Sequence, residues 1–86
     1  MTKTKIWHLI EQKARVSKKK NPSWPDHPAG QAGMVCKESG VLMTSCMNYK
    51  YDRSKDKVLQ AGQVEEMKTN AINTVVAALR FLENIK

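Results

Sequence analysis

The apolar residues between Gln31 and Lys50 recur at spacings of three and four, which is the period of an α-helix. One stripe is apolar apart from its serine and carries Ala32, Val35, Ser39, Leu42, Cys46 and Tyr49. A second line beside it is half polar and carries Met34, Glu38, Val41, Ser45 and Asn48. The pattern predicts a helix that buries one face in a core and turns the neighbouring face toward a pocket.

The end of the chain predicts the most strongly apolar helix, over about residues 63–84. One stripe comprises Val64, Met67, Ala71, Thr74, Ala78, Phe81 and Ile85, and a second comprises Ile72, Val75, Leu79 and Leu82. Two adjoining stripes are typical of a helix that is buried over more than half of its circumference. Two other helices of an 86-residue chain cannot easily cover that much surface. We therefore expect an all-α helical bundle that assembles as a homo-oligomer, either a dimer or a tetramer.

Two further helices are expected in a single domain that spans residues 1–86. The first covers about residues 5–18, with Thr4 as its N-cap. The second covers about residues 28–50, with Asp26 as a capping residue and Pro28 in its first turn.

The connections carry glycine, proline and charge. Gly62 is expected to break or kink the approach to the last helix. The segment that follows the first helix reads KKKNPSWPDHPAG, and its three prolines forbid regular structure. Two roles are open for Trp24 in this loop. It closes the end of the helical core, or it stacks on a base while the lysines of residues 18–20 hold phosphates.

The formal net charge of +7 favours an anionic partner, which includes a nucleotide, a nucleic acid or an acidic protein surface. The alternative is a basic surface that is simply solvated. Cys36 and Cys46 fall about 15 Å apart on one predicted helix, so we read them as reduced thiols of a cytoplasmic protein. We expect no secretory signal and no membrane-spanning segment.

Catalytic and metal-binding motifs are missing from the sequence. It contains no glycine-rich phosphate loop, no CxxC, no HExxH and no GxSxG. His8 and His27 have no second ligand at metal-binding spacing, and neither cysteine has a nearby histidine in sequence. The motifs alone therefore predict no catalytic residue and no metal ligand.

Residues 24–85 resemble the MazG-like all-α nucleoside triphosphate pyrophosphohydrolases, and most closely the short forms common in bacteriophages. The resemblance rests on Trp24-Pro25-Asp26-His27-Pro28, Glu38-Ser39-Gly40, Asn48-Tyr49-Lys50-Tyr51, Ala71-Ile72-Asn73-Thr74 and Arg80-Phe81-Leu82-Glu83-Asn84. It implies a MazG-like helical bundle in a homo-oligomer. It also implies acidic side chains that bind magnesium, which bridges the phosphates of the substrate.

The departures from the family pattern affect the acidic residues. In this register the five acidic positions are Lys37, Glu38, Val41, Asn70 and Asn73, so that one carboxylate remains. Magnesium prefers about six oxygen ligands and is usually held through carboxylates. Without magnesium nothing polarises a phosphate or activates water. The resemblance thus implies that the magnesium cofactor and hydrolysis are both lost, with no catalytic residue and no metal site.

A lysine in place of a metal-binding glutamate can bind phosphate directly. We therefore expect a protein that binds a nucleotide, a cyclic nucleotide or another nucleotide-derived signal without hydrolysis, as a phage anti-defence protein that sequesters a host messenger would. The predicted nucleotide-binding residues are Trp24, Lys37, Glu38, Ser45, Asn48, Lys50, Asn70 and Asn73. The alternatives are a protein that inhibits a host enzyme through protein–protein contacts and a residual pyrophosphohydrolase. Direct nucleic-acid binding is a weaker option, because no recognised motif is present.

Overall fold

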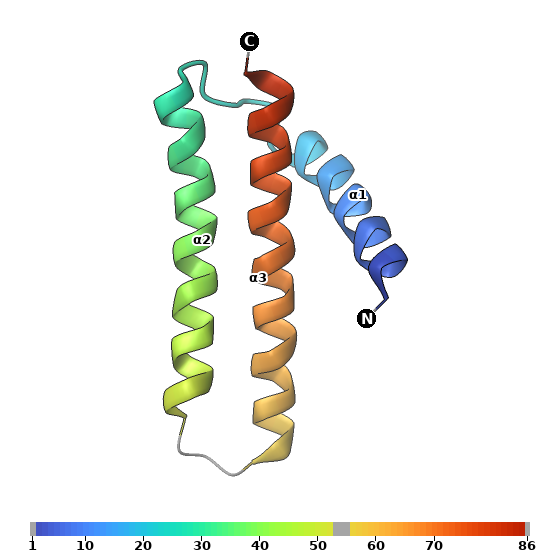
Figure 1. The fold of residues 1–86 in the computed structure, drawn as a ribbon, viewed down its shortest axis with the longest axis vertical. Coiled ribbons are helices and arrows are strands. Elements are labelled where there is room, and N and C mark those ends of the chain that lie inside the picture. Colours follow the sequence, from blue (N-terminus) through green and yellow to red (C-terminus); the bar gives the residue numbers. More distant parts are fainter. Residues whose placement is uncertain (1, 53–55, 86) are drawn as a thin grey trace.

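The computed structural model describes residues 2–52 and 56–85, and these residues form three helices and no strand. The helices are α1 (Lys3–Lys20), α2 (Pro28–Tyr51) and α3 (Lys57–Asn84). Figure 1 shows α2 and α3 as an antiparallel hairpin with α1 beside the upper half of α3. The all-α class predicted from the sequence is confirmed.

Helix α1 begins two residues earlier than the sequence indicated, because Thr2 rather than Thr4 is its N-cap. The hydroxyl of Thr2 accepts a hydrogen bond from the backbone N–H of Lys5 at 3.3 Å. This bond satisfies one of the N–H groups that a helix start leaves unpaired. Thr4 lies inside the first turn, where a capping role is no longer available to it.

Helix α2 is capped by His27 and not by Asp26. The Nδ1 atom of His27 accepts a hydrogen bond from the backbone N–H of Ala29 at 3.0 Å, and Pro28 occupies the first helical position as expected. Asp26 lies one residue too early for capping. Its backbone carbonyl instead accepts a hydrogen bond from the side-chain amide of Gln31 at 3.3 Å.

Helix α3 begins at Lys57 rather than at Gln63, and it continues through Gly62. The Asp56 side chain caps it by accepting hydrogen bonds from the N–H groups of Val58 at 2.9 Å and Leu59 at 3.4 Å. A glycine inside a helix costs about 0.5–1 kcal/mol relative to alanine. That cost is comparable to the contribution of one N-cap, so a capped helix that also packs on α2 passes through Gly62.

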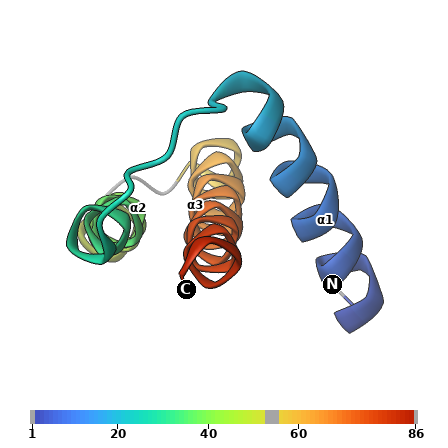
Figure 2. The same cartoon turned by 90° about the horizontal axis from the view of Figure 1, so that it is seen from above.

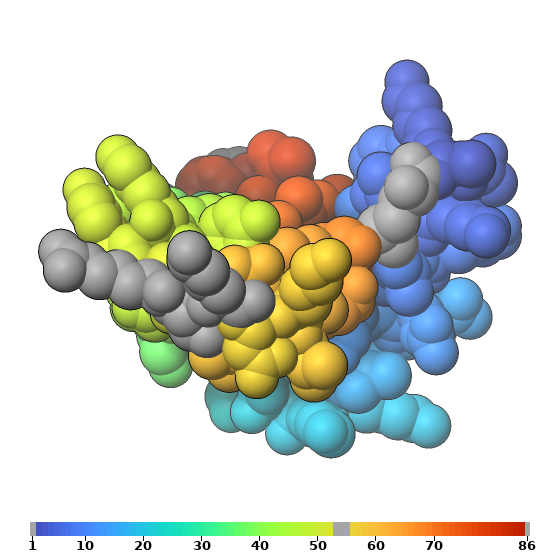
Figure 3. Space-filling view, turned by 90° about the horizontal axis from the view of Figure 1, so that it is seen from below, coloured from blue at the N-terminus to red at the C-terminus, as the bar shows by residue number. Residues whose placement is uncertain are grey.

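The three helices form a single layer with α3 in the middle. Helix α3 contacts both α1 and α2, whereas α1 and α2 do not contact each other. Figure 2, seen along the hairpin, shows α2 and α1 on opposite sides of α3, and Figure 3 shows the same separation from the opposite end. The dimensions of 48 × 27 × 21 Å describe an elongated layer. A single layer cannot enclose a core from all sides.

The buried core is correspondingly small. The buried apolar residues of the described ranges are Ile10 of α1 and Val76 and Ala77 of α3. Val75 and Leu82 of the second α3 stripe remain 38% and 66% exposed. Two helices thus leave part of the apolar surface of α3 uncovered. None of the helices, within the described residues, combines the length and the apolar character needed to cross a membrane.

Candidate functional site

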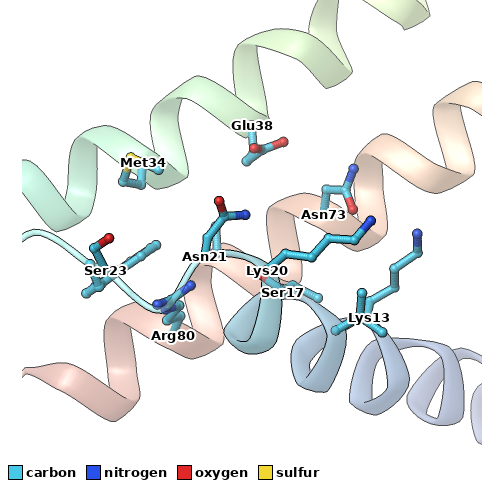
Figure 4. Close-up of a pocket in the computed structure, with 13 residues that line it drawn as sticks. Lys13, Ser17, Lys20, Asn21, Ser23, Met34, Glu38, Asn73 and Arg80 are labelled. Atoms are coloured by element: carbon cyan, nitrogen blue, oxygen red, sulfur yellow. The ribbon is translucent and has the colours of Figure 1, made fainter.

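A cleft lies over α3 where α1 and α2 diverge (Figure 4). Its volume of about 390 Å³ falls within the roughly 300–1,000 Å³ of small-molecule sites. The walls come from the second half of α1, the loop that follows it and the first half of α2, and α3 forms the floor. The lining residues are Lys13, Val16, Ser17, Lys20, Asn21, Ser23, Trp24, Met34, Glu38, Asn73, Val76, Ala77 and Arg80.

The α1 wall is basic because two lysines line it from one face of the helix. Lys13, Ser17 and Lys20 follow one another at spacings of four and three, so helical geometry brings them into line. Figure 4 shows the Lys20 side chain extending toward Asn73. Lysines in the last turn of a helix complement its dipole. Lys13 lies two turns before the end of α1, where this effect has faded.

The floor of the cleft contains a buried arginine that has no carboxylate partner among the described residues. Arg80 is 7% exposed, its guanidinium carbon lies 4.7 Å from the centroid of the Trp24 ring, and its Nη2 donates to the carbonyl of Pro22 at 3.2 Å. The ion pairs of the described residues do not include it. Arginine is almost never buried unless it is paired, and its guanidinium has five N–H donors. Positive charge and donor capacity are therefore available to an anion in the cleft.

Two further lining residues add polar groups that the described chain does not use. The indole Nε1 of Trp24 is buried and has no hydrogen-bond partner. Glu38 is half-buried and forms no hydrogen bond or ion pair with the described residues. In Figure 4 it faces Asn21 and Asn73 across the cleft. Three cations against this one carboxylate give the lining a formal charge of +2.

Trp24, Glu38 and Asn73 are the three predicted binding residues that line the cleft, and the other five do not. Lys37 and Asn48 are exposed on α2. Consecutive helical residues are about 100° apart, so Lys37 cannot share the inward direction of Glu38. The cations of the cleft thus come from α1 and from Arg80, and not from Lys37, which the sequence-based prediction had placed in the site.

The remaining predicted residues have other surroundings. Ser45 is buried and its hydroxyl donates to the carbonyl of Leu42 at 2.8 Å. Asn70 is buried on α3 and its Nδ2 has no partner among the described residues. Lys50 is exposed near the end of α2, with its Nζ 5.2 Å from the centroid of the Tyr51 ring. These residues belong to the helix contacts or to the surface rather than to the cleft.

Sequence reasoning missed Lys13, Ser17 and Arg80 as lining residues. A signal for each was present. Lys13, Ser17 and Lys20 form a polar line in a helix that was assessed for its apolar face alone. Arg80 interrupts the apolar run Ala77-Ala78-Leu79-Arg80-Phe81-Leu82, in line with Asn73 and Ala77. A charge within an apolar stripe indicates a buried, specifically placed cation.

The cleft does not offer a donor set that suits magnesium. Glu38 is its one carboxylate, and three cations surround the same space. Magnesium needs near-octahedral oxygen coordination, usually with one or two carboxylates plus substrate phosphates and water. Across residues 2–52 and 56–85, no group of three or more histidine, cysteine or acidic side chains gathers where it could hold a metal ion.

Comparison of the chain with protein-family models, with curated proteins and with solved structures gives no significant match.

Proposed function

We propose that this protein binds a nucleotide or a nucleotide-derived signal in the cleft without a metal ion and without cleaving it. The observation that carries the proposal is the buried guanidinium of Arg80, which has no carboxylate partner among residues 2–52 and 56–85. It lies in a cleft with Lys13, Lys20 and the Trp24 ring. Burial of an uncompensated charge is costly. A ligand phosphate would supply the missing counter-charge.

The cleft residues suit the two parts of a nucleotide. Lys13, Lys20 and Arg80 can donate charge-assisted hydrogen bonds to a phosphate, each of which contributes about 1.5–3 kcal/mol. The Trp24 ring and the side chain of Met34 offer apolar surface to a base. Glu38 accepts hydrogen bonds and Asn73 both donates and accepts them, so that these two residues can read polar edges of a base or a sugar.

Binding without cleavage follows from the same residues. Hydrolysis of a phosphoanhydride needs a polarised phosphorus centre and an activated water, which a metal ion commonly supplies. Lysine and arginine neutralise phosphate charge but do not generate hydroxide at neutral pH. The cleft therefore favours retention of an intact ligand.

Membership of the MazG-like family, in a catalytically degenerate form, is part of this proposal. Glu38 of α2 and Asn73 of α3 are two of the five positions that carry acids in the family register, and both line the cleft. The role of a cytoplasmic phage protein that sequesters a host messenger fits a site that holds a nucleotide intact.

A second candidate function is inhibition of a host protein through α1. This helix carries seven lysine and arginine side chains against one glutamate. An acidic protein surface would complement it. A stable protein partner recovered from bacterial lysate, in place of nucleotide binding, would favour this candidate.

Isothermal titration calorimetry in EDTA tests the proposal, with ATP, GTP, CTP, UTP, cyclic AMP and cyclic GMP titrated in turn. We expect saturable heat from at least one of them. Lys20→Ala should weaken that binding about tenfold, because it removes one charge-assisted phosphate contact. Lys37→Ala is the matched control and should leave the affinity unchanged, because Lys37 does not line the cleft. No heat from any of the six would refute the proposal.

A further inference from the structure

The outer face of α2, opposite its contact with α3, carries an exposed line of uncharged residues, with the exposed Lys37 and Lys50 at its edges. A line at spacings of three and four runs along it through Gly33, Cys36, Gly40, Met43, Met47 and Tyr51, and all six are exposed. Met43 and Tyr51 are each 63% exposed and Met47 is 42% exposed. Among the 24 residues of α2, the charged ones are Lys37, Glu38 and Lys50. A surface helix normally carries charge on its solvent side, whereas a helix that is apolar all round is typically covered.

Two glycines of this line have no role in the packing of the chain itself. A Cβ atom added at Gly33 or Gly40 would meet nothing within 4 Å, whereas one added at Gly30 would lie 3.0 Å from the Cβ of Pro25. Each interior helical glycine costs about 0.5–1 kcal/mol relative to alanine. Without side chains at these two positions, a second helix can approach the first half of α2 closely.

The distribution of charge points to a second copy of this chain as the occupant. Helix α1 carries seven of the cations and packs on the side of α3 away from α2 (Figure 2). Contact through α2 therefore lets two chains of net charge +7 associate while their most basic helices stay far apart. An acidic partner would find its complement on α1, with its seven cations, rather than on this face, which has two lysines at its edges.

The face is also self-complementary, as a two-fold interface requires. Its first half is small, with Gly33 and Cys36, and its second half is large, with Met43 and Met47. We propose that two copies dimerise through α2 in antiparallel orientation about a two-fold axis near Gly40. This arrangement sets Met47 of each copy against Gly33 of the other, and the Tyr51 ring against the surface around Ala29. The proposal is independent of ligand binding in the cleft.

Sedimentation equilibrium at 10–100 µM tests the interface (a range suited to about 1 µM affinity). We expect twice the 9.8 kDa chain mass for the wild-type protein and a single chain mass for Met47→Glu, with unchanged far-UV circular dichroism. Gly40→Leu should also dissociate the dimer. Gly62→Leu is its matched control, because Gly62 is an equally open interior glycine on α3, and it should remain dimeric. A monomeric wild-type protein, or a Met47→Glu variant that stays dimeric, would overturn the proposal.

Cysteine cross-linking tests the orientation of the two helices in a Cys46→Ser background. In the antiparallel arrangement the two Cys36 residues lie about 12 Å apart along the helices, beyond disulfide reach. A cysteine introduced by Met43→Cys would instead lie beside Cys36 of the other copy. Oxidised glutathione should therefore link the Met43→Cys variant into covalent dimers and leave the Cys46→Ser parent unlinked. Linkage of the parent through Cys36 would indicate a parallel pair and contradict the proposed axis.

Discussion

Replacement of Arg80 by alanine tests whether this residue joins the loop to α3 as the structure indicates. Two interactions would be lost. The first is the contact of the guanidinium with the Trp24 ring at 4.7 Å, and the second is the hydrogen bond to the carbonyl of Pro22 at 3.2 Å. A desolvated cation–π contact contributes about 2 kcal/mol, and a hydrogen bond from a charged donor contributes about 1.5–3 kcal/mol.

The sum of these contributions, about 4 kcal/mol, is an upper bound, because the same substitution relieves the burial of an unpaired charge. We therefore expect the free energy of unfolding to fall by about 2–3 kcal/mol. With a urea m-value of about 2 kcal/mol/M, the unfolding midpoint should move down by about 1–1.5 M. Urea titration followed by circular dichroism at 222 nm measures this shift.

Two further variants distinguish the effect of the stacked guanidinium from the effect of removing any cation from α3. Arg80→Lys keeps the charge but loses the planar group that stacks on Trp24, so its stability should fall between those of the wild-type protein and Arg80→Ala. Lys68→Ala removes an exposed cation of the same helix and should change the unfolding free energy by less than about 1 kcal/mol. An Arg80→Ala midpoint within 0.25 M of wild type (about 0.5 kcal/mol at that m-value) would refute the described role of this arginine.

Two further substitutions test how α1 is attached to α3. Ile10→Ala removes the buried apolar residue of α1, and we expect the free energy of unfolding to fall by about 2–4 kcal/mol in the same urea titration. An unchanged midpoint would show that α1 does not depend on this contact. Lys18→Ala breaks the ion pair with Glu83 at 2.7 Å, whose side chains are about half exposed, and should cost at most about 1 kcal/mol. If the two substitutions lowered the free energy of unfolding equally, the conclusion that the buried Ile10 stabilises α1 more than the exposed ion pair does would be wrong.

The sequence was sufficient to predict the three helices, because their apolar stripes and the proline-rich loop are strong local signals. The boundaries were less accurate. Thr2, His27 and Asp56 act as N-caps through individual hydrogen bonds, and several nearby residues had equal capping ability. The continuation of α3 through Gly62 depends on packing against α2, which local propensity does not describe.

The sequence predicted only part of the candidate site. The residues from α2 and α3 follow from helical register, whereas those from α1 depend on how the helices pack. Glu38 and Asn73 fall on the facing sides of α2 and α3, and their helical register was readable. The contribution of Lys13 and Lys20 requires knowing that α1 packs on α3 and leaves α2 free, which is a tertiary relation. Lys37 was assigned from the family register, in which it takes the place of a glutamate next to Glu38, although adjacent residues of a helix point in different directions.

Phosphorus-31 NMR of ATP, GTP, CTP, UTP, cyclic AMP and cyclic GMP, each with equimolar protein, tests most directly whether the cleft holds a nucleotide intact and without metal. In EDTA, the account predicts that the phosphate resonances of at least one nucleotide shift or broaden on addition of protein, and that Lys20→Ala reduces the change. After magnesium is then supplied in excess over EDTA, the resonances of intact nucleotide should persist overnight. Unchanged spectra for all six nucleotides in EDTA would contradict the account. So would new pyrophosphate or monophosphate resonances that require magnesium.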